Sequence, residues 1–289
     1  MGHTILVLEH RLYYLHDLMD RFVVMEEGVI QKEIGKDELP SVTDKQLASM
    51  GLRGFHPTKL PHSDIFINCD EQIKQAALLE LTHLSFQYDK KEKAVFEKLN
   101  LKMRRGEIVA LVGDNGVGKT TFAKVLTGLL KEQSGAIRIN ERNVNQKQRL
   151  KEIYYVLQDS DYQLFAESVE NELLMKTELT EKKKNEMEYL LSEFELEPYK
   201  KCHPMALSRG QKQRVTIAAA MMSEAKILVL DEPSSGLDGD SMRKLAMLIT
   251  KIAHTGKAVL IISHDVEFIE ICCQRVVELK EGGFYEQTI

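Results

Sequence analysis

The chain of 289 residues has no tryptophan, only six prolines and only four cysteines. The cysteines lack the spacing of a metal site and suit a reducing compartment. They are Cys69, Cys202, Cys272 and Cys273. No apolar run approaches the roughly 20 residues of a membrane-spanning helix. We expect no signal peptide either, because the first residues lead directly into a strand-like segment.

Neither sign of charge dominates. The sequence has 39 Lys and Arg against 44 Asp and Glu, a net charge of −5, and no basic block. We therefore expect no nucleic-acid partner. The length leaves room for one large domain plus an appendage.

What the sequence does contain is a glycine-rich loop between a strand-like and a helix-like segment. Residues 107–112 form an apolar run typical of a buried parallel strand. The loop itself consists of Gly113, Asp114, Asn115, Gly116, Val117, Gly118, Lys119, Thr120 and Thr121. Glycines let backbone N–H groups converge on phosphate oxygens, and the N-terminus of a helix from about residue 119 favours the anion. This pattern predicts a nucleoside triphosphate site, with Lys119 at the β- and γ-phosphates and Thr120 on Mg²⁺. A chance glycine-rich turn is the alternative.

A second apolar run, residues 227–230, ends in the adjacent acids Asp231 and Glu232. Side chains alternate along a strand, so these two carboxylates cannot do the same job. We expect Asp231 to hold Mg²⁺, directly or through water, and Glu232 to polarise the attacking water as general base. An acidic strand end facing solvent is the alternative interpretation.

With these motifs and with Leu-Ser-Arg-Gly-Gln at 207–211, which lies between them, residues 78–289 resemble the ATP-binding-cassette (ABC) ATPases. Every family motif occurs in the family's order. The resemblance implies an α/β P-loop NTPase with a RecA-like parallel sheet core, an antiparallel β subdomain and a helical subdomain between residues 168 and 201. It also implies ATP and Mg²⁺ as cofactors, and ATP hydrolysis coupled to transport.

The same resemblance suggests roles for single residues. Tyr88 looks like the aromatic that stacks on adenine. Gln158 looks like the glutamine that senses the metal and couples to a membrane partner, and residues 234–238 resemble the loop that crosses the dimer interface. His264 looks like the switch histidine that contacts the γ-phosphate, although a lone histidine after a strand is often only a polar cap.

Residues Ser208, Arg209, Gly210 and Gln211 look like the family's signature motif. A serine at the start of a helix-forming run, with exposed backbone N–H groups, makes a second anion site. The resemblance implies that this site contacts the γ-phosphate held by another cassette, so that a homodimer or heterodimer closes head-to-tail around two nucleotides. Arg209 replaces a glycine that is usual in the family. Two interpretations of its side chain remain open, a solvent-facing arginine without a role and a contact with phosphate.

The segment after Gln158, residues 159–169, resembles the energy-coupling-factor (ECF) ATPases, which energise bacterial uptake of vitamins and metal cations. It implies transmembrane coupling and substrate-binding subunits as partners, and a peripheral place on the cytoplasmic face of the cell membrane. The aromatic residues of this segment could instead be core residues under the loop. The transported substrate is not readable from the sequence.

An internal repeat sets the expected domain organisation. A shift of 254 residues aligns 4–30 with 258–284 without a gap. Leu6, His10, Arg21, Val23, Glu27 and Gly28 align with the identical Leu260, His264, Arg275, Val277, Glu281 and Gly282. We therefore expect residues 1–34 to be the C-terminal remnant of a first, truncated cassette, 35–77 a connector and 78–289 a complete cassette. Chance similarity of two short segments is the alternative.

The remnant should contain a strand at residues 5–8, a switch-like His10, a helix and a strand pair around Gly28. It carries no phosphate loop, signature or paired acids, so we expect it to make no nucleotide site. Its strand should lack a sheet and be mobile, swapped or loosely packed. In the connector we expect a short helix near residues 44–50, with His56 and His62 solvated.

Two other functions remain as alternatives. One is a soluble, non-transport ABC ATPase acting on ribosomes or DNA, but the chain has neither the long coiled coil nor the two full cassettes of such proteins. The other is an inactive remnant of a two-cassette protein. Intact Lys119, Asp231, Glu232 and His264 argue against that interpretation.

Overall fold

The computed structural model describes residues 3–26, 28–55, 76–89, 91–175, 177, 179–280 and 283–287. The expectations for His56, His62 and Cys69, and the repeat positions Glu27, Glu281 and Gly282, lie outside the described residues.

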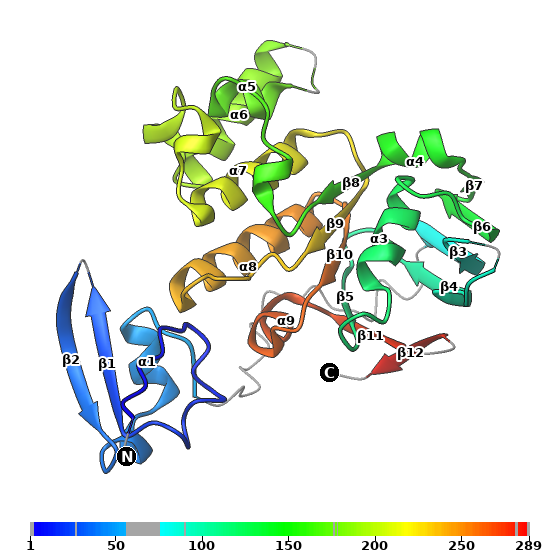
Figure 1. Ribbon diagram of the computed structural model, residues 1–289. Coiled ribbons are helices and arrows are strands. Elements are labelled where there is room, and N and C mark those ends of the chain that lie inside the picture. The colour runs from blue at the N-terminus through cyan, green and yellow to red at the C-terminus, as the bar shows by residue number, and fades with distance from the viewer. Residues whose placement is uncertain are drawn as a thin grey trace.

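A six-stranded sheet forms the centre of the cassette (Figure 1). Its order is β12-β11-β5-β10-β9-β8, and all neighbours are parallel except β12, which runs antiparallel to β11. The strands are β5 (Ile108–Val112), β8 (Ile153–Val156), β9 (Ile227–Asp231), β10 (Ala258–Ile262), β11 (Arg275–Lys280) and β12 (Gly283–Gln287). Continuous apolar runs make β9 and β10 buried along their whole length, as expected for strands covered on both faces.

A second, four-stranded antiparallel sheet has the order β4-β3-β6-β7. Its strands are β3 (Leu79–Phe86), β4 (Phe96–Met103), β6 (Ser134–Ile139) and β7 (Arg142–Asn143). Apolar side chains of both sheets share one core with helix α3 (Lys119–Thr127). The expected parallel core and antiparallel β subdomain are thus confirmed.

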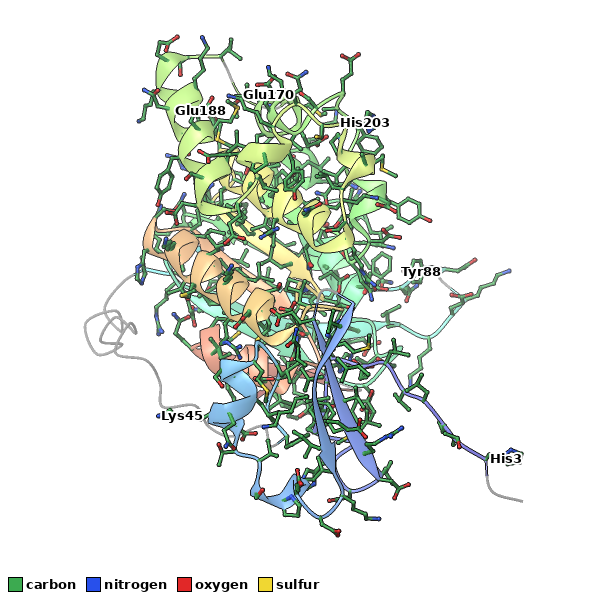
Figure 2. The ribbon with its side chains drawn as sticks, turned by 90° about the vertical axis from the view of Figure 1, so that its left-hand side faces the viewer. His3, Lys45, Tyr88, Glu170, Glu188 and His203 are labelled. Carbon is green, nitrogen blue, oxygen red and sulfur yellow. The ribbon has the colours of Figure 1, made fainter. Side chains whose placement is uncertain are left out.

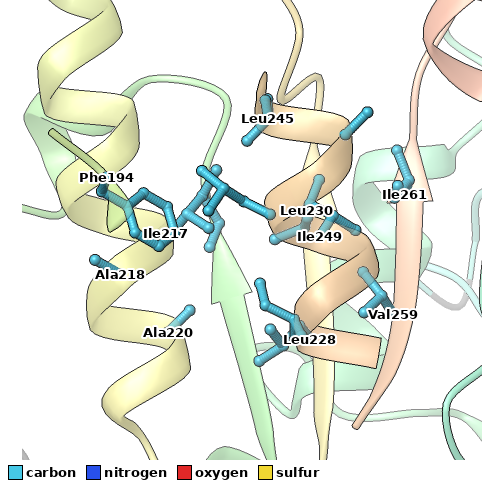
Figure 3. Close-up of a cluster of buried hydrophobic side chains, with 14 of the residues drawn as sticks. Phe194, Ile217, Ala218, Ala220, Leu228, Leu230, Leu245, Ile249, Val259 and Ile261 are labelled. Carbon is cyan, nitrogen blue, oxygen red and sulfur yellow. The ribbon is translucent and has the colours of Figure 1, made fainter. Parts of the chain in front are cut away.

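The expected helical subdomain is also present. It contains α5 (Val169–Leu174) and α6 (Glu181–Glu193), which pack with α7 (Arg209–Met222). Figure 3 shows α7 facing α8 (Gly239–His254) across buried side chains such as Phe194, Ile217 and Ile249. The remaining helices of the cassette are α4 (Gln146–Glu152) and α9 (Val266–Cys272). Across the described residues, the helices are all too short or too polar to cross a bilayer.

Residues before position 56 form a small separate core. Strands β1 (Arg21–Glu26) and β2 (Val29–Gly35) pair antiparallel, which confirms the strand pair expected around Gly28. Helix α1 (Asp44–Ser49) confirms the short helix expected in the connector, and Thr43 begins it with a capping box. The core residues are Leu12, Phe22, Val24, Ile34, Leu39, Leu47 and Phe55.

Two expectations for the first residues are wrong. Residues 5–8 form no strand, and their side chains are largely exposed, with Leu8 at 85%. Figure 2 shows the chain near His3 running away from the body of the molecule. Residues 13–18 make hydrogen-bonded turns in place of a helix. An apolar, strand-like sequence stays extended when no neighbouring strand is present to accept its backbone hydrogen bonds.

Amide hydrogen exchange should reproduce this gradient of order. We expect residues 5–8 to exchange almost without protection, β1 and β2 to show intermediate protection, and β5 to exchange most slowly, because only β5 lies within a covered sheet. Mass spectrometry of peptic fragments measures all three segments in one sample. Protection of residues 5–8 equal to that of 108–112 would contradict the structure.

Candidate functional site

The phosphate-binding loop lies between β5 and α3. Its glycines adopt backbone angles that other residues avoid, with φ of 145° at Gly113 and 108° at Gly118. A side chain at Gly113 would collide with the carbonyl oxygen of Leu279. The loop is therefore held against β11, and it delivers the chain to the first turn of α3 at Lys119.

Lys119 points back into its own loop. Its ammonium group donates hydrogen bonds to the carbonyl oxygens of Gly113, at 2.6 Å, and Asp114, at 2.9 Å. Burial lowers the pKa of Lys119, an effect that the negative charges of Glu232 and Asp231 oppose. A desolvated ammonium group at this place is a ready partner for phosphate oxygens.

A polar cavity of about 450 Å³ opens beside this loop. Its lining includes most of the site residues predicted from the sequence: Asn115, Gly116, Gly118, Lys119, Thr120, Thr121, Gln158, Asp231, Glu232 and His264. Gly113, Asp114 and Val117 belong to the same loop but do not line the cavity. Three lining residues were not among the predicted site residues, namely Arg11, Ser235 and Ile262.

The buried Asp231 carboxylate, 5% exposed, is held by two hydroxyl groups. Its Oδ2 accepts hydrogen bonds from Thr120 Oγ1, at 3.2 Å, and from Tyr155 OH, at 2.7 Å. Burial raises the pKa of Tyr155 far above its usual range, so the phenol stays a hydrogen-bond donor. A carboxylate beside a threonine hydroxyl offers the hard oxygen ligands that Mg²⁺ prefers, and the residues present fit that ion. Tyr155 was missed because nothing in a strand sequence shows which residue of a neighbouring strand its side chain will meet.

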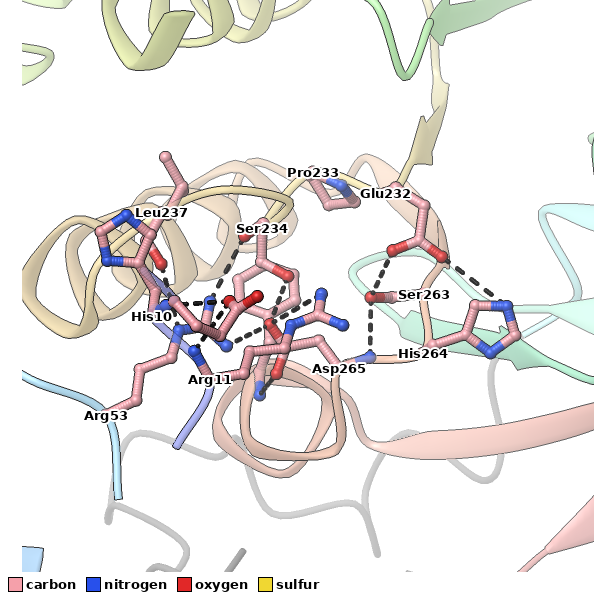
Figure 4. Close-up of polar contacts among 12 residues, drawn as sticks. His10, Arg11, Arg53, Glu232, Pro233, Ser234, Leu237, Ser263, His264 and Asp265 are labelled. Carbon is pink, nitrogen blue, oxygen red and sulfur yellow. Dashed lines mark hydrogen bonds and ion pairs between the residues drawn. The ribbon is translucent and has the colours of Figure 1, made fainter. Parts of the chain in front are cut away.

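Glu232 occupies a strained and partly dehydrated position. Its φ of 49° lies in the left-handed region, and its backbone N–H donates to the carbonyl oxygen of Ile262 at 2.8 Å. Its carboxylate accepts a hydrogen bond from Ser263 Oγ, at 3.3 Å, and lies 3.9 Å from His264 Nε2 (Figure 4). Burial raises the pKa of Glu232 and lowers that of His264. Both shifts favour the neutral forms. The upward shift brings the pKa of the Glu232 carboxyl closer to neutral pH, which suits a general base.

Tyr88 and the signature residues lie apart from this cavity. Tyr88 is 60% exposed, and its OH forms a hydrogen bond with Thr121 Oγ1 at 3.0 Å. It therefore lies next to the phosphate loop but does not line the cavity. Ser208 caps α7 and forms a capping box with Gln211. Together with Gly210, these two residues line another cavity, of about 300 Å³, beside α8.

Arg209 is exposed, and a methyl group at Gly236 would lie 3.6 Å from its Nη1. The Arg209 side chain therefore lies beside the 234–238 loop. The sequence did not suggest this neighbour for Arg209.

The segment after Gln158 presents two aromatic side chains to solvent. Tyr162 is 73% exposed and Phe165 is 74% exposed, so the alternative that they are core residues is wrong for both. Gln163 fixes the segment, because its amide donates to the Tyr155 carbonyl and accepts from the Leu157 N–H. Phe165 also lines a cavity of about 200 Å³ with Tyr154 and Met175.

Arg11 brings the N-terminal segment to the cavity, which the expectation that this segment makes no nucleotide site of its own did not include. Its Nη2 lies 3.8 Å from Asp265 Oδ2, next to His264 (Figure 4). The repeat contained a signal that was available in advance, since its offset aligns Arg11 with Asp265. Residues at equivalent positions of paired repeats meet near the axis that relates them.

Comparison with known proteins agrees with this geometry. The family model described as ABC transporter matches residues 96–235. A Treponema denticola protein that carries the name of an ABC transporter ATP-binding protein is 39% identical over 285 residues, 99% of this chain and 58% of its own length. The chain thus spans little more than half of that relative.

Two solved structures have the same fold. CbiO1 of Clostridium perfringens, described as part of the ABC transporter complex cbiONQ, superposes with a TM-score of 0.66 at 29% identity, over 73% of this chain and 88% of its own. An ATP-binding subunit of an ABC transporter gives a TM-score of 0.65 at 30% identity, over 73% of this chain and 90% of its own. The chain belongs to the family of ABC transporter ATP-binding proteins.

Proposed function

We propose that the chain is the ATP-hydrolysing subunit of an ABC importer of the ECF type. The observation that carries the proposal is the single cavity shared by Lys119, Thr120, Asp231, Glu232 and His264. Phosphate-binding, metal-binding and general-base groups converge there, as phosphoryl transfer requires.

In this proposal the loop N–H groups and Lys119 bind the β- and γ-phosphates of ATP. Thr120 and Asp231 would hold Mg²⁺ and Gln158 would sense it, and the bound ion would supply neutralisation of the charge that develops on the phosphates. Tyr155 keeps the Asp231 carboxylate oriented through its hydrogen bond. Glu232 takes a proton from the attacking water, and His264 contacts the γ-phosphate. Tyr88 stacks on the adenine.

A second cassette completes the nucleotide site. The signature residues Ser208 and Gly210 line a different cavity from the phosphate loop, so one chain does not bring both halves together. A head-to-tail pair of cassettes does, and ATP binding and hydrolysis then close and reopen the pair.

The ECF type is supported by residues 159–169 and by the similarity to CbiO1. The exposed Tyr162 and Phe165 give this segment an apolar surface, which is suited to a transmembrane coupling subunit at the cytoplasmic face of the membrane. The cargo of such an importer is a vitamin or a metal cation, recognised by a separate substrate-binding subunit.

We further propose that residues 1–34 belong to a first cassette, 35–77 to a connector and 78–289 to a complete cassette. The β1–β2 hairpin corresponds to β11 and β12 through the repeat. The ion pair of Arg11 with Asp265, its equivalent in the repeat, supports the view that the two segments face each other across a pseudo-twofold axis.

Replacing Glu232 tests the proposed reaction. We expect Glu232→Gln to lower the rate of ATP hydrolysis by about 10²- to 10⁴-fold, because the amide cannot accept the proton of the attacking water. ATP binding, followed with a fluorescent ATP analogue, should be retained. Glu224→Gln is the matched control, since Glu224 is exposed and lies outside the cavity. Near-zero hydrolysis in both the wild type and Glu232→Gln would favour an inactive remnant.

The raised pKa of Glu232 also predicts how stability depends on pH. Burial penalises the ionised carboxylate, so the wild type loses stability as the pH rises through the raised pKa. Glu232→Gln removes that penalty. Without nucleotide, its melting temperature should exceed that of the wild type at pH 8, and the difference should vanish near pH 4. An equal difference at both pH values would show that the ionised carboxylate carries no penalty.

A further inference from the structure

Arg53, within the connector, is buried against the cassette with only 2% of its surface exposed. Its guanidinium group reaches two loops that are far apart in sequence (Figure 4). Nη1 donates to Asp265 Oδ2 at 2.6 Å, Nε to the Leu237 carbonyl at 3.1 Å and Nη2 to the Ser234 carbonyl at 3.3 Å. One side chain thus ties the 234–238 loop, which follows β9, to the loop that follows β10.

The same Asp265 oxygen also accepts a hydrogen bond from Ser234 Oγ at 2.6 Å, and both residues are buried. The other carboxylate oxygen caps α9 through the Phe268 N–H. Asp265 therefore has little freedom to move while Arg53 is in place. A planar guanidinium with donors in a fixed fork is well suited to such a three-way contact.

From Asp265 a short path leads to the reacting groups. Its backbone N–H donates to Ser263 Oγ at 3.1 Å, and Ser263 Oγ donates to the Glu232 carboxylate at 3.3 Å. His264 lies between Ser263 and Asp265 in the chain. The position of Arg53 is thereby linked to that of both Glu232 and His264, without direct contact with either.

The rest of the connector is docked closely enough to hold Arg53 in place. The Asp240 N–H donates to the Gly51 carbonyl, and a side chain at Gly239 would collide with the Leu52 carbonyl. On the surface of the same contact, Arg243 donates to the carbonyls of Leu52 and Ala48. The charged groups that face Arg53 are Asp265 and Glu267. Arg11 Nη2 lies 3.8 Å from the same Asp265 oxygen that Arg53 binds.

We propose that Arg53 is a positioning residue for ATP hydrolysis, through which docking of the connector aligns Glu232 and His264. This inference rests on the proposed function. It adds that the connector contributes to the rate of the reaction and not to nucleotide binding, because the three hydrogen bonds of Arg53 go to the 234–238 loop and to Asp265 and not to the phosphate loop.

The test compares Arg53→Met and Arg53→Lys with the control Arg243→Met in the full 289-residue chain. Arg243 lies on α8 and also donates hydrogen bonds to the connector. Its hydrogen bonds go to Leu52, Ala48 and Asp240, and not to residues 232–238 or 263–265. Two readouts are measured for each variant. They are kcat and KM for MgATP, and hydrogen exchange of the peptides that cover residues 232–238, 263–268 and 108–121.

For Arg53→Met we expect kcat to fall by about 10- to 100-fold with KM changed less than about 2-fold, as for a displaced catalytic group. Exchange should rise in 232–238 and 263–268 and stay unchanged in 108–121. Arg53→Lys should be intermediate in both readouts, because an ammonium group cannot span three acceptors. Arg243→Met should keep the wild-type kcat and exchange in these loops.

Wild-type kcat and exchange in Arg53→Met would overturn the proposal. The proposal would also be overturned if kcat fell in both Arg53→Met and Arg243→Met in proportion to the loss of melting temperature in each. Such a result would mean that kcat depends on how stably the connector docks and not on the hydrogen bonds of Arg53. If Arg53→Met does not fold, the exchange pattern of Arg53→Lys decides in the same way. A wild type that hydrolyses no ATP would refute the proposed function, while the exchange data would still test the role of Arg53.

Discussion

The parallel pairing of three strands brings together most of the residues that line the cavity beside the phosphate loop. β10 pairs with both β5 and β9, so the carboxyl ends of all three strands meet at one edge of the sheet. The phosphate loop follows β5, Asp231 is the last residue of β9 and is followed by Glu232, and His264 lies two residues beyond β10. Groups separated by more than a hundred residues thus come within one cavity, as is general for ligand sites of open α/β sheets.

This geometry also explains how far the sequence could predict the site. The phosphate loop and the paired acids are local patterns whose spacing carries their chemistry, so their place followed once the strands were identified. Tyr155 and Arg53 act through contacts made only in the folded chain, with Asp231 and Asp265, and no local pattern marks such partners. Arg11 was different, because the internal repeat already aligned it with Asp265.

The sequence failed most clearly where an element depends on something beyond its own residues. Ile5 to Leu8 have the composition of a strand, but a strand needs a neighbour for its backbone N–H and C=O groups. In this chain they stay extended and exposed. The hairpin β1–β2 formed as predicted because its two strands satisfy each other and also cover Leu12 and Leu47.

The ion pair between Arg11 and Asp265 has a consequence for the choice of partner. In two identical cassettes related by a twofold axis, the position equivalent to Asp265 is also an aspartate. Each of these aspartates would therefore lie near another negative charge. Here the equivalent positions carry opposite charges. Under the proposed two-cassette organisation, such a difference would stabilise the pairing of unlike halves and disfavour the pairing of like ones, which is how charge patterns set specificity in other assemblies. The two halves of such a pair would not be equivalent, because His10 is followed by an arginine and His264 by an aspartate.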